Sequence, residues 1–251
     1  MSKVIAVHSF RGGTGKSNTT ANVATVLAAE GKRVGIIDTD ISSPGIHVLF
    51  GLQEDDIRSS LNDYLWGKCQ IEDAAQEVTA RLSSPIRGNL YLVPSSMKPG
   101  DIARVLREGY DVGLLSDGYQ RLISALKLDV LMIDTHPGLN EETLLSIAIS
   151  DALVIIMRPD SQDYQGTAVT VEVARKLDVQ RLLLVVNKVP TSFNLAEVKA
   201  RVEKTYDCEV AGILPHSDEM MTLASSGIFV LRYPAHPVTA VLKQIAARVM
   251  E

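Results

Sequence analysis

The chain has 251 residues, of which 46% are hydrophobic and 22% are charged, and its formal net charge at pH 7 is −5. A chain of this length can bury a sizeable core without disulfides or metals, and the composition excludes a disordered or coiled protein. The acidic balance excludes a protein that is basic all over, so any nucleic-acid contact would need a local patch.

The cysteines and histidines show no metal-binding pattern. Cys69 and Cys208 lie far apart without a Cys-x-x-Cys spacing, so we expect buried, reduced thiols. The first apolar run is too short for a signal peptide, no run is long enough to span a membrane, and we therefore expect a cytoplasmic protein. Five histidines lack metal-ligand spacing and are expected to be structural: His8, His47, His136, His216 and His236.

Strand and helix patterns alternate along the chain. Apolar runs predict strands at 4–7, 34–37, 90–93, 130–133, 152–157, 182–186 and 210–214. Helical spacing predicts helices at 17–30, 101–108, 113–126, 162–177, 195–206 and 238–250. The segment 53–87 is mixed, and we expect short helices there with inward-packing Leu61, Tyr64, Leu65 and Trp66.

This alternation predicts an α/β fold, with a mostly parallel β-sheet flanked by helices on both faces. No Pro-, Gly- or Ser-rich linker divides the chain, so we expect a single domain over residues 1–251. Ligands of such sheets gather at the carboxyl ends of the strands, where the candidate site residues fall.

The segment from Ser9 to Asn18 reads SFRGGTGKSN and stands between the first strand and the first helix. Its glycines let backbone N–H groups turn inward, and the helix directs its positive dipole end at the same point. Lys16 would place a charge between the terminal phosphates of a ligand, and the Ser17 hydroxyl would bind Mg²⁺. The segment therefore predicts a phosphate-binding loop.

An ordinary loop of this kind has glycine five residues before its Gly-Lys pair, where this chain has Phe10. The pattern that fits is x-Gly-Gly-x-Gly-Lys-Ser/Thr, and with this deviant Walker A motif the chain resembles the MinD/ParA family of dimerising P-loop ATPases. The resemblance implies ATP and Mg²⁺ as cofactors and an ATP-dependent homodimer. It also implies that Arg11, which replaces the family's lysine, reaches into the nucleotide of the partner copy. The loop residues implied to bind nucleotide are Arg11, Gly12, Gly13, Thr14, Gly15, Lys16, Ser17 and Asn18.

Two acidic motifs follow predicted strands. In Asp38-Thr39-Asp40, the resemblance assigns Asp40 to the attacking water, and we expect Asp38 to contribute to the metal site. In Asp134-Thr135-His136-Pro137-Gly138, four apolar residues precede an aspartate in a Walker B arrangement, which holds Mg²⁺ through a water. The predicted catalytic residues are thus Arg11, Lys16 and Asp40, and the predicted metal residues are Ser17, Asp38 and Asp134.

The segment Asn187-Lys188-Val189-Pro190 indicates which nucleotide base the protein recognises. GTPases read guanine with Asn-Lys-x-Asp, and Pro190 stands at the aspartate position, so guanine recognition is unsupported. The resemblance implies that Asn187 contacts adenine and that the loop containing Pro215 lies on the adenine side. Taken alone, an asparagine that ends a strand is more often a turn residue.

Six basic residues on and between two predicted helices leave nonspecific DNA binding open. Glutamates 172, 197 and 203 interleave with them, which favours a solvated face of mixed charge over a DNA-binding patch. DNA binding would imply association with the nucleoid. The basic residues are Arg175, Lys176, Arg181, Lys199, Arg201 and Lys204.

The resemblance implies an ATP hydrolase that switches between dimer and monomer to position or partition a chromosome, plasmid, division site or protein compartment, with a protein partner or activator. We expect its hydrolysis to be slow, because Arg11 stands in place of the family's lysine. Membrane attachment through a basic amphipathic tail is not expected, because the chain ends at Glu251, just after the last helix. Arg11 and Asn18 depart from the family pattern, so an ATP-binding regulator with little or no hydrolysis is the alternative. A tyrosine kinase would need a C-terminal tyrosine cluster, and an iron–sulfur reductase would need suitably placed cysteines.

Overall fold

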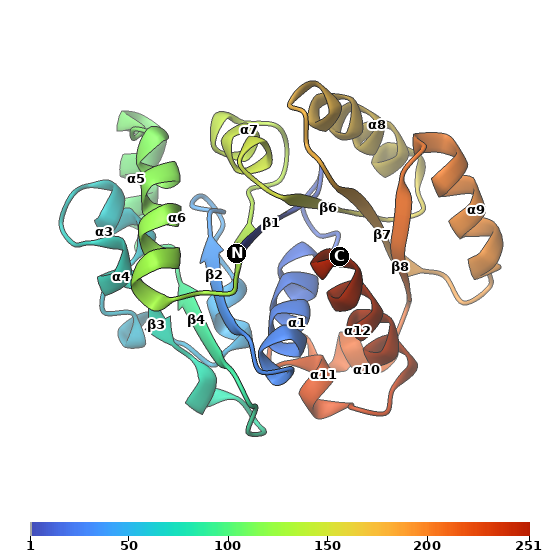
Figure 1. Ribbon diagram of the computed structural model, residues 1–251, viewed down its shortest axis with the longest axis horizontal. Helices are drawn as coiled ribbons and strands as arrows, with labels where there is room; N and C mark the ends of the chain where they lie inside the picture. The colour runs from blue at the N-terminus through green and yellow to red at the C-terminus, as the bar shows by residue number, and fades with distance from the viewer. Residues whose placement is uncertain (1) are drawn as a thin grey trace.

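The computed structural model describes residues 2–251, except for the side chain of Leu106, and contains an eight-stranded sheet (Figure 1). The strand order is β3-β4-β2-β5-β1-β6-β7-β8, and the short edge strand β3 is antiparallel to β4 whereas the other pairs are parallel. The strands are β1 (Lys3–His8), β2 (Arg33–Asp38), β3 (Gln76–Glu77), β4 (Asn89–Val93), β5 (Val130–Asp134), β6 (Ala152–Met157), β7 (Leu182–Val189) and β8 (Glu209–Pro215).

Helices cover both faces of the sheet. One face packs against α1, α11 and α12, and the other packs against α3, α4 and α6 to α9 (Figure 1). The helices are α1 (Lys16–Ala29), α2 (Ile46–Leu49), α3 (Leu61–Leu65), α4 (Ile71–Ala74), α5 (Pro99–Glu108), α6 (Gly113–Leu126), α7 (Glu141–Ala148), α8 (Ser161–Lys176), α9 (Leu195–Tyr206), α10 (Asp218–Leu223), α11 (Phe229–Arg232) and α12 (Pro237–Met250).

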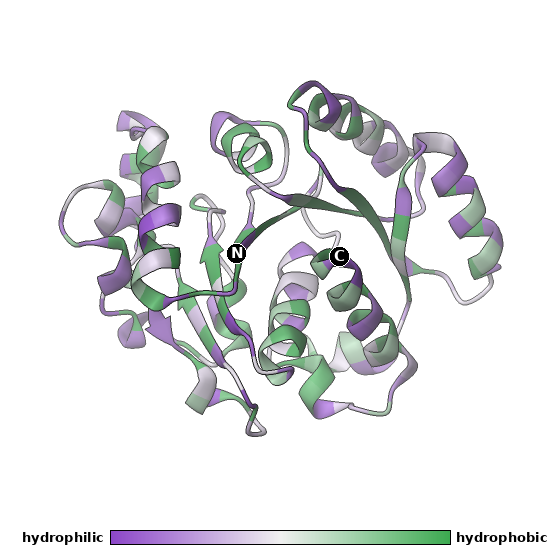
Figure 2. Cartoon of the chain, in the orientation of Figure 1, coloured by the Kyte–Doolittle hydropathy of each residue, from purple (hydrophilic) through white to green (hydrophobic). Residues whose placement is uncertain are grey.

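The central strands are apolar along their whole length because both of their faces are covered. In β1, Ile5 and Val7 face the α1 side, whereas Ala6 contributes to the core beneath α8 and α9. Figure 2 shows the hydrophobic strands at the centre and hydrophilic residues on the outer helices. This arrangement confirms the predicted α/β fold with a mostly parallel, doubly covered sheet.

The segment 53–87 matches its sequence prediction only in part. Its short helices are present, and Leu61 and Leu65 are buried as expected. Tyr64 and Trp66 are only half-buried, and the Arg104 guanidinium lies 4.4 Å from the Trp66 ring centroid. The segment also contains β3, whose two residues were too few to give an alternating pattern. Within residues 2–251, no helix combines the length and apolar character needed to cross a membrane.

Candidate functional site

The carboxyl ends of five strands bring the predicted site residues to one edge of the sheet. Asp38 and Asp134 are register partners at the ends of β2 and β5, and Val7 of β1 pairs with the same Asp134. Asn187 lies near the end of β7 and Pro215 ends β8, beyond the loop that leads from β1 into α1. We call the ends of β1, β2 and β5 the phosphate side, and the ends of β7 and β8 the base side.

Glycine is required in the loop before α1 at a specific point. Gly15 has φ 92° and forms the N-terminal boundary of the 14-residue helix α1. A Cβ atom there would lie 2.3 Å from Asn187 Nδ2, whereas a Cβ at Gly12 would meet nothing within 4 Å. The loop therefore packs tightly against β7 at Gly15 and stays open at Gly12. The free N–H groups at the start of α1 suit an anion in that open part.

Lys16 and Asp134 form a buried ion pair on the phosphate side. Lys16 Nζ donates to Asp134 Oδ1 over 2.8 Å, and both side chains are at most 5% exposed. The Thr20 hydroxyl donates to the same oxygen over 3.1 Å. Asp134 Oδ2 is buried and has no hydrogen-bond partner in the described part of the chain. A metal-bound water could supply that missing donor, so Asp134 fits the predicted magnesium role.

Asp38 is fully buried, and its oxygens hold the loop that follows β2. Its Oδ1 accepts the backbone N–H of Asp40 over 3.1 Å, and its Oδ2 accepts that of Gly45 over 3.3 Å. Burial raises the pKa of Asp38 to about 8, and the charge of Asp134 adds to this effect. The prediction that Asp38 binds the metal remains a prediction, and the geometry shows it instead engaged with backbone groups of its own loop.

Asp40 is bonded to a histidine that sequence reasoning missed. The distance from His136 Nδ1 to Asp40 Oδ1 is 2.6 Å, and the Ser42 hydroxyl lies 3.2 Å from the same nitrogen. The hydrogen bond with Asp40 raises the pKa of His136. The sequence signal was its place two residues after Asp134, in the loop after the strand that neighbours the one that delivers Asp40. Metal-ligand spacing was the wrong test for this residue.

His8 follows the structural role that we expected. Its Nδ1 lies 2.9 Å from the Thr135 hydroxyl, and the residue is fully buried at the end of β1. Burial lowers the pKa of His8 to about 3, and the nearby Lys16 charge adds to this effect. The imidazole is therefore neutral at physiological pH.

The base side contains a cavity of about 240 Å³ beside the start of α1. Asn187 lines it, but its amide is also engaged by the protein. Nδ2 donates to the Thr14 carbonyl over 2.8 Å, and Oδ1 accepts the Lys188 N–H over 2.8 Å. Among residues 2–251, one N–H of Asn187 thus has no partner and remains for a ligand. Other lining residues are Gly15, Asn18, Pro215, Met220 and Leu242.

Arg11 lies against the N-terminal end of α8 in its own chain. Its Nε donates to Asp163 Oδ1 over 2.5 Å, and its NH2 group donates to both oxygens of Asp160 over 3.0 Å. A further hydrogen bond joins Arg11 to Gln162. Next to it, the ring of Phe10 packs on Gly166, where an added Cβ would lie 2.1 Å from a ring carbon. The loop is thus attached to α8 by two neighbouring side chains.

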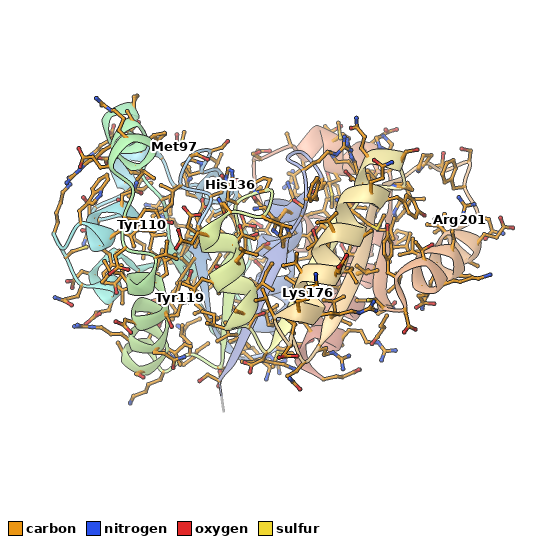
Figure 3. The ribbon with its side chains drawn as sticks, turned by 90° about the horizontal axis from the view of Figure 1, so that it is seen from above. Met97, Tyr110, Tyr119, His136, Lys176 and Arg201 are labelled. Atoms are coloured by element: carbon orange, nitrogen blue, oxygen red, sulfur yellow. The ribbon has the colours of Figure 1, made fainter. Side chains whose placement is uncertain are left out.

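Three of the basic residues of α8 and α9 have partners in the described part of the chain, Arg175, Lys176 and Lys199, whereas Arg181 lies between α8 and β7 and pairs with Glu251. Lys176 bonds to Glu172 over 3.0 Å, and the Arg175 guanidinium donates to the carbonyl of Tyr206 at the end of α9 over 2.6 Å. Figure 3 shows Lys176 on α8 and Arg201 on α9. These pairs support the prediction of a solvated face of mixed charge.

The family comparison agrees with this geometry. The model of the ParA family, described as NUBPL iron-transfer P-loop NTPase, matches residues 1–250. The chain belongs to the ParA family of P-loop NTPases. The ParA-family relatives include an uncharacterised ATP-binding protein of Methanocaldococcus jannaschii, 28% identical over 251 residues, which cover 100% of this chain and 88% of the relative.

The septum site-determining protein MinD of Synechocystis is 25% identical over 232 residues, which cover 90% of this chain and 81% of that protein. Among solved structures, MinD of Pyrococcus horikoshii complexed with Mg-ADP superposes with a TM-score of 0.81 at 20% identity, covering 99% of this chain and 96% of that one. These relatives are MinD- and ParA-type proteins, as the loop motif indicated.

The family model is described as an iron-transfer protein, but the two cysteines of this chain do not form a cluster. Cys69 follows α3, in the region that packs beside β4 near one edge of the sheet. Cys208 directly precedes β8, which is the strand at the other edge (Figure 1). Both thiols are half-buried and not fully buried as the sequence predicted, and burial raises the pKa of each. One chain therefore does not bring its two thiolates together for an iron–sulfur centre.

Proposed function

We propose that this protein is an ATP-dependent switch whose single domain, residues 1–251, hydrolyses ATP slowly. The observation that carries the proposal is the position of Asp40, two residues after Asp38, whose register partner on β5 is the Asp134 that pairs with Lys16. Family membership supports a P-loop ATPase. The Asp40 carboxylate is a group able to orient and deprotonate a water. Hydrolysis requires such a group, whereas nucleotide binding does not.

ATP would bind along the strand ends. The N–H groups of the loop from Gly12 to Gly15 and the start of α1 would hold the phosphates, and Lys16 would leave Asp134 to pair with them. The adenine would enter the cavity between Asn187 and Pro215. Mg²⁺, held by Ser17 and through water by Asp134, would neutralise phosphate charge. The Mg-ADP complex of the Pyrococcus horikoshii protein supports this choice of ligands.

Hydrolysis would depend on Asp40 and on a second copy of the chain. Arg11 would exchange Asp160 and Asp163 for the phosphates of the partner's nucleotide, since a guanidinium can bond two phosphate oxygens at once. Those carboxylates compete with the nucleotide for Arg11, which would disfavour the dimer and slow turnover. Arg11→Ala is therefore expected to lose ATP-dependent dimerisation and most of the remaining activity.

The biological role that we propose is positioning or partitioning of a cargo. The name of the Synechocystis relative, a septum site-determining protein, supports this class of role. A protein partner or activator would bind the dimer. DNA binding, if it accompanies this role, should need ATP and weaken steeply with salt, because a local basic patch binds by displacing counterions. An ATP-binding regulator without turnover is the competing function, and the departures at Arg11 and Asn18 favour it.

The test is an ATPase assay together with the oligomeric mass, each with and without ATP. We expect slow phosphate release by the wild-type protein and a dimer with ATP. Asp40→Ala should still bind ATP and run as a dimer, but it should release no phosphate. Turnover by Asp40→Ala at the wild-type rate would refute the assignment of Asp40. A wild-type protein that binds ATP and never releases phosphate would instead favour the regulator.

A further inference from the structure

His136 and Asp40 come from the loops after two adjacent strands, β5 and β2. Figure 3 shows His136 in the loop that leads into α7. Its Nδ1 lies 2.6 Å from Asp40 Oδ1. A carboxylate only accepts hydrogen bonds, so the imidazole donates from Nδ1 to Oδ1.

The backbone of Asp40 is fixed by its own loop. Its N–H donates to Asp38 Oδ1 over 3.1 Å, and its carbonyl accepts the N–H of Ser43 over 3.1 Å. These bonds set where the side chain starts but leave rotation about its own torsions free. In residues 2–251, the donor that reaches the Asp40 carboxylate is His136. The ring therefore determines which way this carboxylate points.

The loop that carries His136 is itself anchored to the phosphate-binding loop. The His136 carbonyl accepts from the Thr143 hydroxyl over 3.1 Å, and the Gly138 N–H donates to the Ser9 carbonyl over 3.3 Å. The Thr135 N–H donates to the carbonyl of Val7 in β1 over 3.2 Å. The ring thus stands at a fixed place relative to the phosphates that the loop would bind.

We propose that His136 is a positioning residue that orients the Asp40 carboxylate for ATP hydrolysis. This inference rests on the proposed function, in which Asp40 serves the attacking water. With Oδ1 bonded to the ring, Oδ2 is the oxygen left to accept the proton of that water. A carboxylate held by one oxygen keeps the other at a constant distance from the phosphates, which is the geometric requirement for a general base.

Three substitutions of His136 separate positioning from simple packing. In His136→Ala the donor is lost, and we expect kcat to fall about tenfold with little change in KM for ATP or in the affinity for a non-hydrolysable ATP analogue. In His136→Asn the amide Nδ2 can occupy the place of Nδ1, so most of kcat should return. In His136→Gln the amide lies one bond further out, near the place of Nε2, and kcat should stay low.

A second readout does not depend on turnover. In protein labelled with ¹⁵N at histidine, the His136 Nδ1 resonance should show a bonded proton in the ligand-free wild type and should shift in Asp40→Ala. An unchanged resonance in Asp40→Ala would show that the bond is absent in solution and would overturn the proposal. So would wild-type kcat in His136→Ala, or an equal loss in the Ala and Asn variants.

A failure of the proposed function would give a different set of results from a failure of the positioning role alone. If Asp40→Ala turns over ATP like the wild type, Asp40 has no role in hydrolysis, and the inference about His136 falls with it even when the resonance shifts. If Asp40→Ala abolishes turnover and His136→Ala does not, the proposed function stands and only the positioning role is overturned. A higher KM in His136→Ala at constant kcat would also assign the residue to binding and overturn the proposal.

Discussion

The phosphate side and the base side of the same sheet edge are built differently. On the phosphate side, Lys16 pairs with Asp134, Asp40 bonds to His136, and Asp38 bonds to backbone groups. On the base side, the structure contains a cavity of about 240 Å³ lined largely by uncharged side chains, among them Pro215. On the phosphate side, charged side chains are thus held by ion pairs and hydrogen bonds. The base side instead offers a cavity that a ligand can enter.

The difference shows how each half could contribute to affinity. A triphosphate must first replace the protein's own partners of Lys16, so part of its binding free energy is offset by the ion pair that it breaks. A base that enters an existing cavity gains from burial without such a loss. The predictions below test this contrast, and the largest expected effect comes first.

Removal of Lys16 should disturb the phosphate side most. In Lys16→Ala the buried Asp134 loses its cation, and breaking a buried pair in this way costs about 3 kcal/mol or more of unfolding free energy. Binding of an ATP analogue should also be lost. Urea unfolding measures the first effect and equilibrium titration the second. Lys188→Ala is the control, because Lys188 is exposed and, in the described part of the chain, its ammonium bonds only to the Gly13 carbonyl; equal destabilisation by the two changes would contradict the contrast.

The contact between the two sides can be tested at the glycines. Gly15→Ala forces a side chain into a left-handed conformation and against the Asn187 amide, so we expect a loss of about 2 kcal/mol in unfolding free energy. Gly12→Ala is the matched control, since its Cβ meets nothing within 4 Å, and its unfolding free energy should stay within about 0.5 kcal/mol of wild type. Chemical denaturation of both variants decides the point. Similar values for the two would mean that the loop adjusts freely.

The phosphate side should also make folding sensitive to acid through His8. The folded-state pKa of about 3 is below the usual value of 6.5, so the unfolded chain binds a proton between these values and the folded chain does not. The contribution of His8 to the unfolding free energy is then fully present above pH 6.5 and is lost as the pH falls toward 3. From pH 6 to pH 5, the wild type should lose about 1 kcal/mol more than His8→Asn, which keeps a donor for Thr135. Parallel stability curves for the two proteins would exclude this role.

The smallest expected effect concerns base selection. Pro190 stands where a guanine-reading aspartate would be, and the one free N–H of Asn187 suits a ring nitrogen acceptor such as adenine provides. We expect ATP to displace a labelled ATP analogue at concentrations about fivefold lower than GTP, a difference of about 1 kcal/mol. Equal displacement by the two nucleotides would refute adenine preference.

The sequence predicted the sheet well because buried parallel strands are apolar runs of readable length, such as 152–157, which matches β6. It also predicted which strand ends carry polar residues, and the structure brings Lys16 and Asp134 together as those positions require. It could not predict β3, whose two residues have no period, or the bond between His136 and Asp40. Such a bond depends on the register of two strands far apart in the chain. The single-domain prediction and the roles of the site residues stay predictions.

The packing of Phe10 on Gly166 has a consequence for how this sequence can change over time. The ring occupies the space that any side chain at position 166 would need, since an added Cβ would lie 2.1 Å from it. A lineage that gains a side chain at 166 must therefore first reduce the residue at 10, and one that keeps the aromatic ring must keep the glycine. We expect the two positions to co-vary among descendants of this gene, although one belongs to the phosphate-binding loop and the other to the second turn of α8.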